Sequence, residues 1–194
     1  MITIVYAHPS ENSHNATIRK ALGEHLKTNK QKHDFIDLYK DCFNPALSAD
    51  ELKSFFTFTG ESSDPLVKKY QVILKETTHL VFMFPIWFND QPAILKGFFE
   101  RTCLPGFAFT SDENGIVPLL THVRRLTVLT TSGAPTETLT TISGNMIQKQ
   151  FINNIVQNLI GHTTNDEDAR WFNLGPAVPE ALDGHIAKIK ERFQ

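Results

Sequence analysis

The chain has 194 residues, of which 41% are hydrophobic and 21% charged, a composition typical of a soluble globular protein. Its net charge of −2 gives no basic footprint for nucleic acid, and no apolar run approaches the roughly 20 residues of a membrane span. Residues 1–6 lack the basic segment of a signal peptide, and Cys42 and Cys103 lie far apart. We therefore expect a cytoplasmic protein with two reduced, buried thiols and no membrane span.

Short apolar runs rich in β-branched residues alternate with longer amphipathic stretches. The runs predict strands at 2–7, 33–38, 80–84, 125–131 and 170–174. The longer stretches predict helices at 13–27, 64–76, 92–103, 144–160 and 179–193. The first, third and fourth strands are almost continuously apolar, as inner parallel strands covered on both faces are. The second and fifth strands carry more polar residues, so we expect them at the sheet edges.

Five strands alternating with five helices predict an α/β fold, a three-layer sandwich of right-handed βαβ units. For this count we predict a five-stranded parallel sheet in the flavodoxin-like order 2-1-3-4-5, with residues 1–194 as a single domain. Segment 41–63 is too long for a simple βα loop. Within it, Ser48 and Glu51 have the spacing of a capping box that opens a short helix. Its phenylalanines are expected in the core, or else at a ligand rim or a subunit contact.

The loop after the first strand, residues 6–15, contains no glycine and does not match the GxGxxG dinucleotide fingerprint. It is rich in hydroxyl and amide side chains and leads directly into a helix, whose first N–H groups attract anions. We expect Ser13, Asn15 and Thr17 to donate hydrogen bonds to a phosphate there, and His8 to add a ring N–H. The alternative is that Ser13 or Asn15 only caps the helix.

The loop after the third strand carries Trp87 and Phe88. Ligands of open α/β sheets bind beyond the carboxyl ends of the strands, so these rings offer a flat apolar wall there. The alternative places them in the core.

The loop after the fourth strand, residues 130–135, is either an ordinary turn or a place where Gly133 lets a ligand approach the backbone. In the predicted strand order the three loops are neighbours, and together they suit a phosphorylated planar heterocycle such as flavin.

These residues resemble the motifs of the flavodoxin-like NAD(P)H:quinone oxidoreductases. That family includes DT-diaphorase-like enzymes and the quinone-reductase subunits that accompany potassium-efflux systems. The resemblance covers most of the chain, and its motifs are His8-Pro9 with Ser13-His14-Asn15, Phe84-Pro85-Ile86-Trp87-Phe88, Pro92-Ala93-Ile94-Leu95-Lys96-Gly97, Gly106-Phe107-Ala108-Phe109 and Thr130-Thr131-Ser132-Gly133. The block from Pro92 to Gly97, at its spacing from Phe84-Pro85, is the most specific part.

The resemblance implies a bound flavin, either FAD or FMN, with NAD(P)H as co-substrate. Three sets of residues would bind the flavin. The residues at the ribityl phosphate would be His8, Ser13, His14, Asn15 and Thr17. The residues along the isoalloxazine would be Pro85, Ile86, Trp87 and Phe88. The residues at its pyrimidine edge would be Thr131, Ser132 and Gly133. Backbone N–H groups around Ser132 and Gly133 are expected to stabilise the negative charge of the reduced flavin. Gly97, Glu100 and Arg101 are expected to be structural, fixing helix packing and a surface pair.

The implied activity is a ping-pong, two-electron transfer from NAD(P)H through the flavin to a quinone or a similar small-molecule acceptor. No side chain is assigned a catalytic role. DT-diaphorase-like members carry a Tyr and a His after the fourth strand, where this chain has Thr136-Glu137-Thr138 and Ser143. The resemblance also implies a homodimer, with Phe107, Phe109 and the cluster from Phe55 to Phe58 as candidate contacts.

Two alternatives stay open. A relative of this kind is a flavin-binding regulatory subunit of a membrane transport system with little turnover of its own. A one-electron carrier is the other alternative, but such carriers are strongly acidic, which does not fit a net charge of −2. No metal is expected, because the eight histidines form no HxxxH or HExxH pair. The chain also lacks the GxSxG motif of hydrolases and the phosphate loop of nucleotide triphosphatases.

Overall fold

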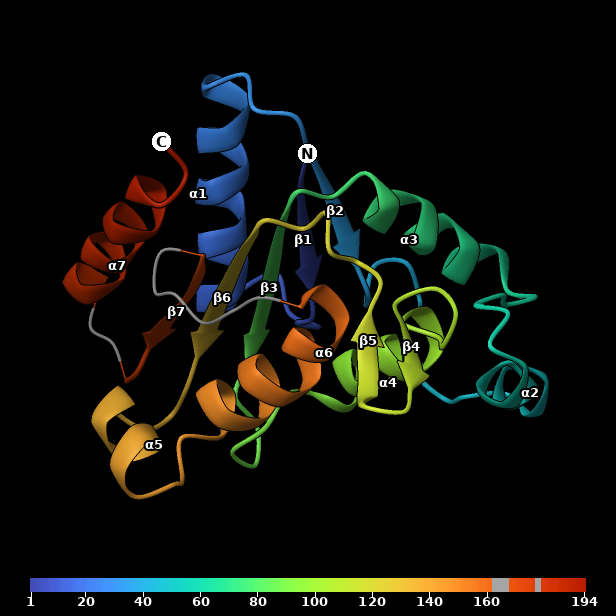
Figure 1. Cartoon of the computed structure of the whole chain (residues 1–194). Helices are drawn as coiled ribbons and strands as arrows, with labels where there is room; N and C mark the ends of the chain where they lie inside the picture. The colour runs from blue at the N-terminus through green and yellow to red at the C-terminus, as the bar shows by residue number, and fades with distance from the viewer. Residues whose placement is uncertain (162–167, 177–178) are drawn as a thin grey trace.

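The computed structural model describes residues 1–161, 168–176 and 179–194. Its middle layer is a five-stranded parallel sheet in the order β2-β1-β3-β6-β7 (Figure 1). The strands are β1 (Ile2–Tyr6), β2 (His33–Asp37), β3 (His79–Pro85), β6 (Arg125–Thr131) and β7 (Ala169–Leu174). Because β6 and β7 are the fourth and fifth strands of this sheet, the predicted order 2-1-3-4-5 is confirmed. The two strands with more polar residues do lie at the edges.

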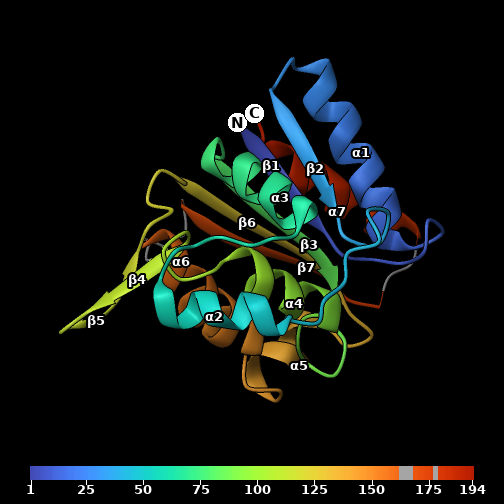
Figure 2. The ribbon, with the colours of Figure 1, turned by 90° about the vertical axis from the view of Figure 1, so that its right-hand side faces the viewer.

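Helices cover both faces of the sheet (Figures 1 and 2). On one face, α1 (His14–Thr28) and α7 (Pro179–Glu191) pack against side chains such as Ile4 and Val81. On the other face, α3 (Pro65–Lys75) and α4 (Ala93–Thr102) pack against Val5 and Phe82. Neighbouring residues of one strand thus belong to opposite cores, which is why the inner strands are apolar at every position.

The predicted helix at 144–160 is present, but most of it is not an α-helix. Residues Ile147–Val156 form the π-helix η1, followed by the short α6 (Gln157–Ile160). The backbone N–H of Gln157 donates to the carbonyl of Ile152, five residues earlier. The wider turn keeps Ile147, Phe151, Ile152 and Val156 buried on one face, a spacing that the sequence pattern alone assigned to an α-helix.

Three further elements lie outside the alternation of strands and helices. The predicted capping box opens α2 (Ala49–Thr57): Ser48 Oγ accepts from the Glu51 N–H at 3.1 Å, and the Glu51 carboxylate accepts from the Ser48 N–H at 3.0 Å. The hairpin of β4 (Phe109–Asp112) and β5 (Gly115–Pro118) projects from the body (Figure 2), and α5 (Thr136–Thr141) follows β6. The hairpin and α5 were not predicted, because each is too short to show a hydrophobic period.

A buried ion-pair network holds α2 against α4. Arg101 is only 5% exposed, and its Nη2 lies 2.7 Å from Glu51 Oε1 and 2.8 Å from Asp64 Oδ2. Burial alone raises the pKa of Glu51, but hydrogen bonds from Arg101, Ser48 and Ser62 outweigh it and lower this pKa to about 2. The expected surface pair joins Glu100 to Lys96, whereas Arg101 belongs to the interior.

Close packing also explains Gly97. A Cβ at this position on α4 would lie 2.3 Å from the carbonyl oxygen of Pro45, so only glycine lets the preceding loop approach the helix.

The two cysteines are free thiols, and Cys103 is buried. The expectation for Cys42 is wrong, because it is exposed in the turn after β2, where its φ is 52°. Within the three described ranges, no helix combines the length and apolar character needed to cross a bilayer.

Candidate functional site

The first loop of the candidate site joins β1 to α1. Ser13 is the N-cap of α1: its Oγ accepts from the Ala16 N–H at 3.1 Å and donates to the Ser10 carbonyl at 2.9 Å. The amides of His14 and Asn15 lie in the first turn, where the helix has no carbonyl to accept from them, and they carry the positive end of the helix dipole. Capping and anion binding are therefore compatible here, with the Ser13 hydroxyl used by the helix and the amides left for a ligand.

Asn15 connects this loop to the end of β6. Its side chain is 1% exposed, and its Nδ2 donates to Thr131 Oγ1 at 2.6 Å. Its Oδ1 has no hydrogen-bond partner among the described residues, although it is buried. An unpartnered buried acceptor is costly, and a ligand hydroxyl or N–H would satisfy it. The ribityl hydroxyls of a flavin are donors of this kind, whereas a phosphate is not.

The aromatic loop is a tight two-residue turn beyond β3. Trp87 and Asp90 exchange both backbone hydrogen bonds at 3.0 Å, and Phe88 and Asn89 between them have φ values of 51° and 62°. A left-handed phenylalanine is costly and is held here by its flanking pair. Trp87 is 41% exposed and Phe88 is fully exposed, so neither lies in the core. The rings of Trp87 and His8 lie 6.1 Å apart, which joins this turn to the first loop.

The loop after β6 offers fewer free donors than the sequence suggests. The Ser132 N–H donates to the Leu174 carbonyl at 2.9 Å, so the expectation that it is available to a ligand is wrong. The hydrogen-bonded ladder between β6 and β7 extends one residue past Thr131, and the Ser132 N–H is part of this ladder. The Ser132 hydroxyl donates to the Ala134 carbonyl at 2.7 Å and accepts from Asn173 Nδ2 at 2.9 Å. The Thr131 hydroxyl, which accepts from Asn15, keeps its own proton, and the exposed Gly133 has open space around its Cα.

The structure brings most of the predicted residues to one edge. His8, Asn15, Trp87 and Thr131 are joined by the contacts above, and the Ile86 N–H donates to the Thr131 carbonyl at 2.7 Å. Three predicted residues stand apart from this centre. Pro85 is buried at the end of β3, the His14 side chain is exposed, and Thr17 lines a separate cleft of about 740 Å³ between α1 and β2.

Asn173 is a residue that sequence reasoning missed. Its Oδ1 accepts from the Thr130 hydroxyl at 2.8 Å, and its Nδ2 donates to the hydroxyls of Ser132 and Thr136. It therefore fixes the loop after β6 from the neighbouring strand. Its sequence signal is an amide near the carboxyl end of the fifth predicted strand.

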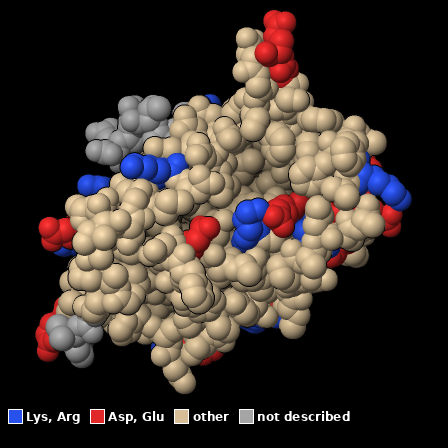
Figure 3. All heavy atoms as spheres, turned by 90° about the horizontal axis from the view of Figure 1, so that it is seen from below, with Lys and Arg blue, Asp and Glu red and all other residues tan. Residues whose placement is uncertain are grey.

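The carboxyl edge of the sheet is an open surface. Seen from below, most of this surface is uncharged, with a few acidic and basic side chains near its middle and others toward its rim (Figure 3). No group of three His, Cys, Asp or Glu side chains in the described part of the chain is placed to hold a metal ion. The edge thus combines helix amides, one unpartnered acceptor and an exposed aromatic turn. These hydrogen-bonding groups and this aromatic surface fit a flavin.

The parallel order and the loops at the carboxyl edge define an α/β protein of the kind that binds ligands where its strand order reverses. A family model described as a flavodoxin-like fold matches residues 1–191, and the chain belongs to this family.

Relatives and a solved structure agree with this assignment. NAD(P)H dehydrogenase (quinone) 1 of Rattus norvegicus is 33% identical over 121 residues, which are 55% of this chain and 44% of that protein. The FMN-dependent NADH:quinone oxidoreductase of Coprothermobacter proteolyticus is 28% identical over 137 residues, 68% of each chain. The crystal structure of Smu.1420 from Streptococcus mutans UA159 covers 100% of this chain and 99% of its own, with a TM-score of 0.81 and 25% identity. The chain spans about half the length of the first curated relatives that it matches.

Proposed function

We propose that this protein is a flavin-dependent NAD(P)H:quinone oxidoreductase. The observation that carries the proposal is the meeting of three loops at one edge of the sheet, through the bond from Asn15 to Thr131 and the contact of His8 with Trp87. The names of the rat and Coprothermobacter relatives support it. The cofactor is FMN or FAD, and the co-substrate is NADH or NADPH.

Each part of the flavin has a matching group in the chain. The amides of His14 and Asn15 would hold the phosphate, and the unpartnered Asn15 Oδ1 would accept from a ribityl hydroxyl. The Trp87 ring would lie along the isoalloxazine. The Thr131 hydroxyl and the Gly133 N–H would donate to its pyrimidine edge. When bound, the flavin supplies two-electron transfer between nicotinamide and quinone.

His8 is suited to the phosphate end. Burial lowers the pKa of His8, so its ring is neutral at pH 7. His8 Nδ1 lies 3.0 Å from the Ser10 backbone nitrogen and 3.2 Å from the Ser10 carbonyl oxygen, so Nδ1 is engaged by Ser10. Nε2 is then the ring nitrogen left for a ligand. The exposed apolar turn at Trp87 and Phe88 binds flat molecules with few polar constraints, which favours a quinone-like acceptor.

We also propose that the protein is a homodimer working in the cytoplasm, with residues 1–194 as one domain. An open site needs a cover to exclude water, and a second subunit would supply it. Exposed apolar side chains near segment 41–63 and the hairpin support a subunit contact; they are Leu52, Phe56, Phe58 and Ile116. Among the candidates from the sequence, Phe107 and Phe109 are half-buried against the core. Free thiols suit a reducing compartment.

The decisive experiment is an absorption spectrum of the purified chain after addition of FMN or FAD, followed by oxidation of NADH and NADPH with a quinone. We expect one flavin per chain and steady turnover without a protein partner. A variant Trp87→Ala is expected to weaken flavin binding, because it removes the ring wall, while Ile142→Ala, another exposed apolar position, serves as the matched control.

Three other outcomes are informative. Failure to bind either flavin would refute the proposal. Flavin binding with negligible turnover would instead favour the regulatory subunit of a transport system. Equal flavin affinity of the Trp87→Ala and Ile142→Ala variants would show that the aromatic turn is not the flavin wall.

A further inference from the structure

A cavity of about 480 Å³ lies at the opposite, amino-terminal edge of the sheet. The first residues of β1, β3 and β6, the turn before β2 and the chain after α7 form its walls. Its volume is within the range of small-molecule sites. β3 runs the whole width of the sheet from His79 at this edge to Pro85 at the other, and seven residues of strand span about 20 Å. The cavity is therefore separate from the candidate flavin site.

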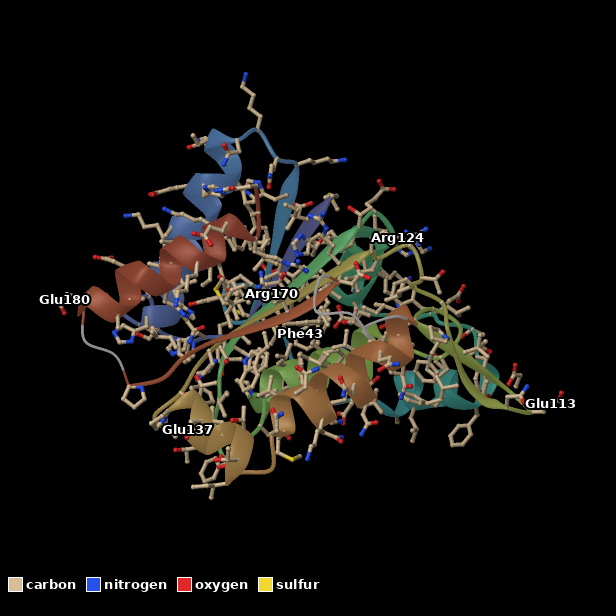
Figure 4. All side chains as sticks on the ribbon, turned by 60° about the vertical axis from the view of Figure 1, so that its left-hand side comes forward. Phe43, Glu113, Arg124, Glu137, Arg170 and Glu180 are labelled. Atoms are coloured by element: carbon tan, nitrogen blue, oxygen red, sulfur yellow. The ribbon has the colours of Figure 1, made fainter. Side chains whose placement is uncertain are left out.

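The charged side chains that line this cavity are all cationic. They are Lys32, Arg124, Arg125 and Arg192, and no Asp or Glu side chain is among the lining residues. Lys32, Arg124 and Arg125 are exposed and form no ion pair within the part of the chain that the structure describes. Figure 4 shows Arg124 at the amino-terminal end of β6.

The inner wall of the cavity is flat and mainly apolar. His79 is 6% exposed, and its ring stacks on Phe193 with centroids 4.9 Å apart and planes 11° apart. Its Nε2 contacts Thr127 Oγ1 at 2.8 Å, while its Nδ1 has no hydrogen-bond partner in the described ranges. Ile2 lines the wall beside the stacked rings.

Burial lowers the pKa of His79 to about 3, with further contributions from Arg192 and Arg125. The ring is thus neutral at physiological pH and can donate or accept a hydrogen bond at Nδ1. Arg192 Nη2 also donates to the Asp168 carbonyl at 3.3 Å, which fixes its guanidinium near this wall. The cationic rim and the neutral, flat inner wall together suit a ligand with two chemically different parts.

We propose that this cavity binds a small organic anion, a phosphate or carboxylate carried on a flat apolar body. The anionic group lies among Lys32, Arg124 and Arg125, and the apolar body lies against the half-buried Ile2 at the mainly apolar inner wall. Guanidinium groups favour this arrangement because they bind carboxylate and phosphate through paired donors. The site does not depend on the proposed flavin chemistry.

The test uses 2-naphthyl phosphate as the probe, with 2-naphthol and inorganic phosphate as comparisons that each lack one part. Binding is measured by calorimetry on the full chain, with and without saturating FMN. The double variant Arg124→Ala/Arg125→Ala is compared with Lys68→Ala/Lys69→Ala, which removes two positive charges from exposed positions of α3. All three proteins are first checked for equal melting temperature.

We expect the probe to bind with a stoichiometry of one, more tightly than either comparison and equally well with FMN present. Loss of the two arginines is expected to weaken binding about tenfold, because charge-assisted contacts are removed, while the lysine variant stays within about twofold. Absence of binding, displacement by FMN, or equal weakening by the two double variants would each overturn the proposal. Binding of inorganic phosphate as tight as that of the probe would show that the cationic rim acts without the apolar wall, and would likewise reject it.

Discussion

Asn15 illustrates how one buried side chain assembles the candidate site. It lies on the first turn of α1, directly after β1, and its Nδ2 reaches the hydroxyl at the end of β6, which lies on the far side of β3 in the sheet order. The same bond orients the Thr131 hydroxyl, because an oxygen that accepts from Asn15 has its proton free to donate elsewhere. The helix amides and the β6 loop are thereby held in one arrangement before any ligand arrives.

Replacing Asn15 with Leu removes this bond and leaves Thr131 without its donor. We expect the free energy of unfolding without flavin to fall by about 1–3 kcal/mol, the usual cost of an unsatisfied buried group. If the flavin proposal holds, affinity for FMN falls at least about tenfold as well, since the loops lose their register. Urea unfolding and flavin fluorescence titration measure the two effects.

The matched control is Asn12→Leu, at an exposed position of the same loop. If Asn15→Leu were no less stable than Asn12→Leu, the hydrogen bond from Asn15 to Thr131 would not contribute to stability. A loss of stability with unchanged flavin affinity would separate its structural role from its role in the site.

The sequence predicted the position of a residue only where that residue follows the end of a predicted strand. Trp87 follows an apolar strand, and Asn15 opens a helix after another, so both were assigned to the carboxyl edge. The engagement of the Ser132 N–H depends on how far β7 pairs with β6, and no local pattern encodes that register. Exposure of Cys42 similarly follows from the turn geometry after β2.

At the level of elements, α2 presents a face that nothing in the described chain covers. Phe56 is 80% exposed, and Leu52, one turn earlier, lies on the same face. The Arg101–Glu51 pair holds this helix rigidly against α4, so the exposed face is presented in a fixed orientation. An ordered helix with an apolar outer face is typical of a protein interface.

If this face forms the proposed dimer contact, Phe56→Glu will produce monomers, because it buries a charge in an apolar interface. We expect a dimer mass for the parent chain in analytical ultracentrifugation and a monomer mass for the variant. Thr57→Glu adds the same charge at the next position, which points about 100° away around the helix, and should remain dimeric. A monomeric parent chain, or a dimer that survives Phe56→Glu, contradicts this contact.

Hydrophobic periodicity predicted some of the helices and strands and missed others. Long apolar repeats identified the five sheet strands and the helices between them, because burial on two faces leaves a strong signal. The π-helix shares its apolar spacing with an α-helix over two turns, so only the backbone bond from Gln157 to Ile152 distinguishes them. The hairpin at 109–118 lies outside the main sheet and has exposed residues on both strands, which leaves little alternation to detect.

Across the whole molecule, two buried titratable groups with large pKa shifts contribute strongly to the dependence of stability on pH. His79 lies at the amino edge and has its pKa lowered to about 3, chiefly by burial, from an unfolded value of about 6.5. Glu51 lies beneath α2, where burial is outweighed by hydrogen bonds from Arg101 and serines, and its pKa is lowered to about 2. In both cases the unfolded chain takes up the proton first, so acid favours unfolding.

We therefore expect the free energy of unfolding to be greatest above pH 6.5. It should decline as the pH falls toward 3, where the contribution of His79 is lost. A steeper decline should begin near pH 4.5, where Glu51 adds its own loss. Urea unfolding followed by tryptophan fluorescence at a series of pH values measures this profile.

Variants separate the two contributions. His79→Gln should make the profile shallower between pH 6.5 and about 4.5, because glutamine does not titrate. Glu51→Gln should lower stability above pH 4.5 by about 3 kcal/mol, since the buried Arg101 loses one of its two carboxylate partners and keeps only Asp64, and the difference from the parent should shrink toward pH 2. A parent profile that is flat from pH 6.5 to 4.5 would mean that His79 is protonated in the folded chain, in conflict with its stacking on Phe193 among three arginines.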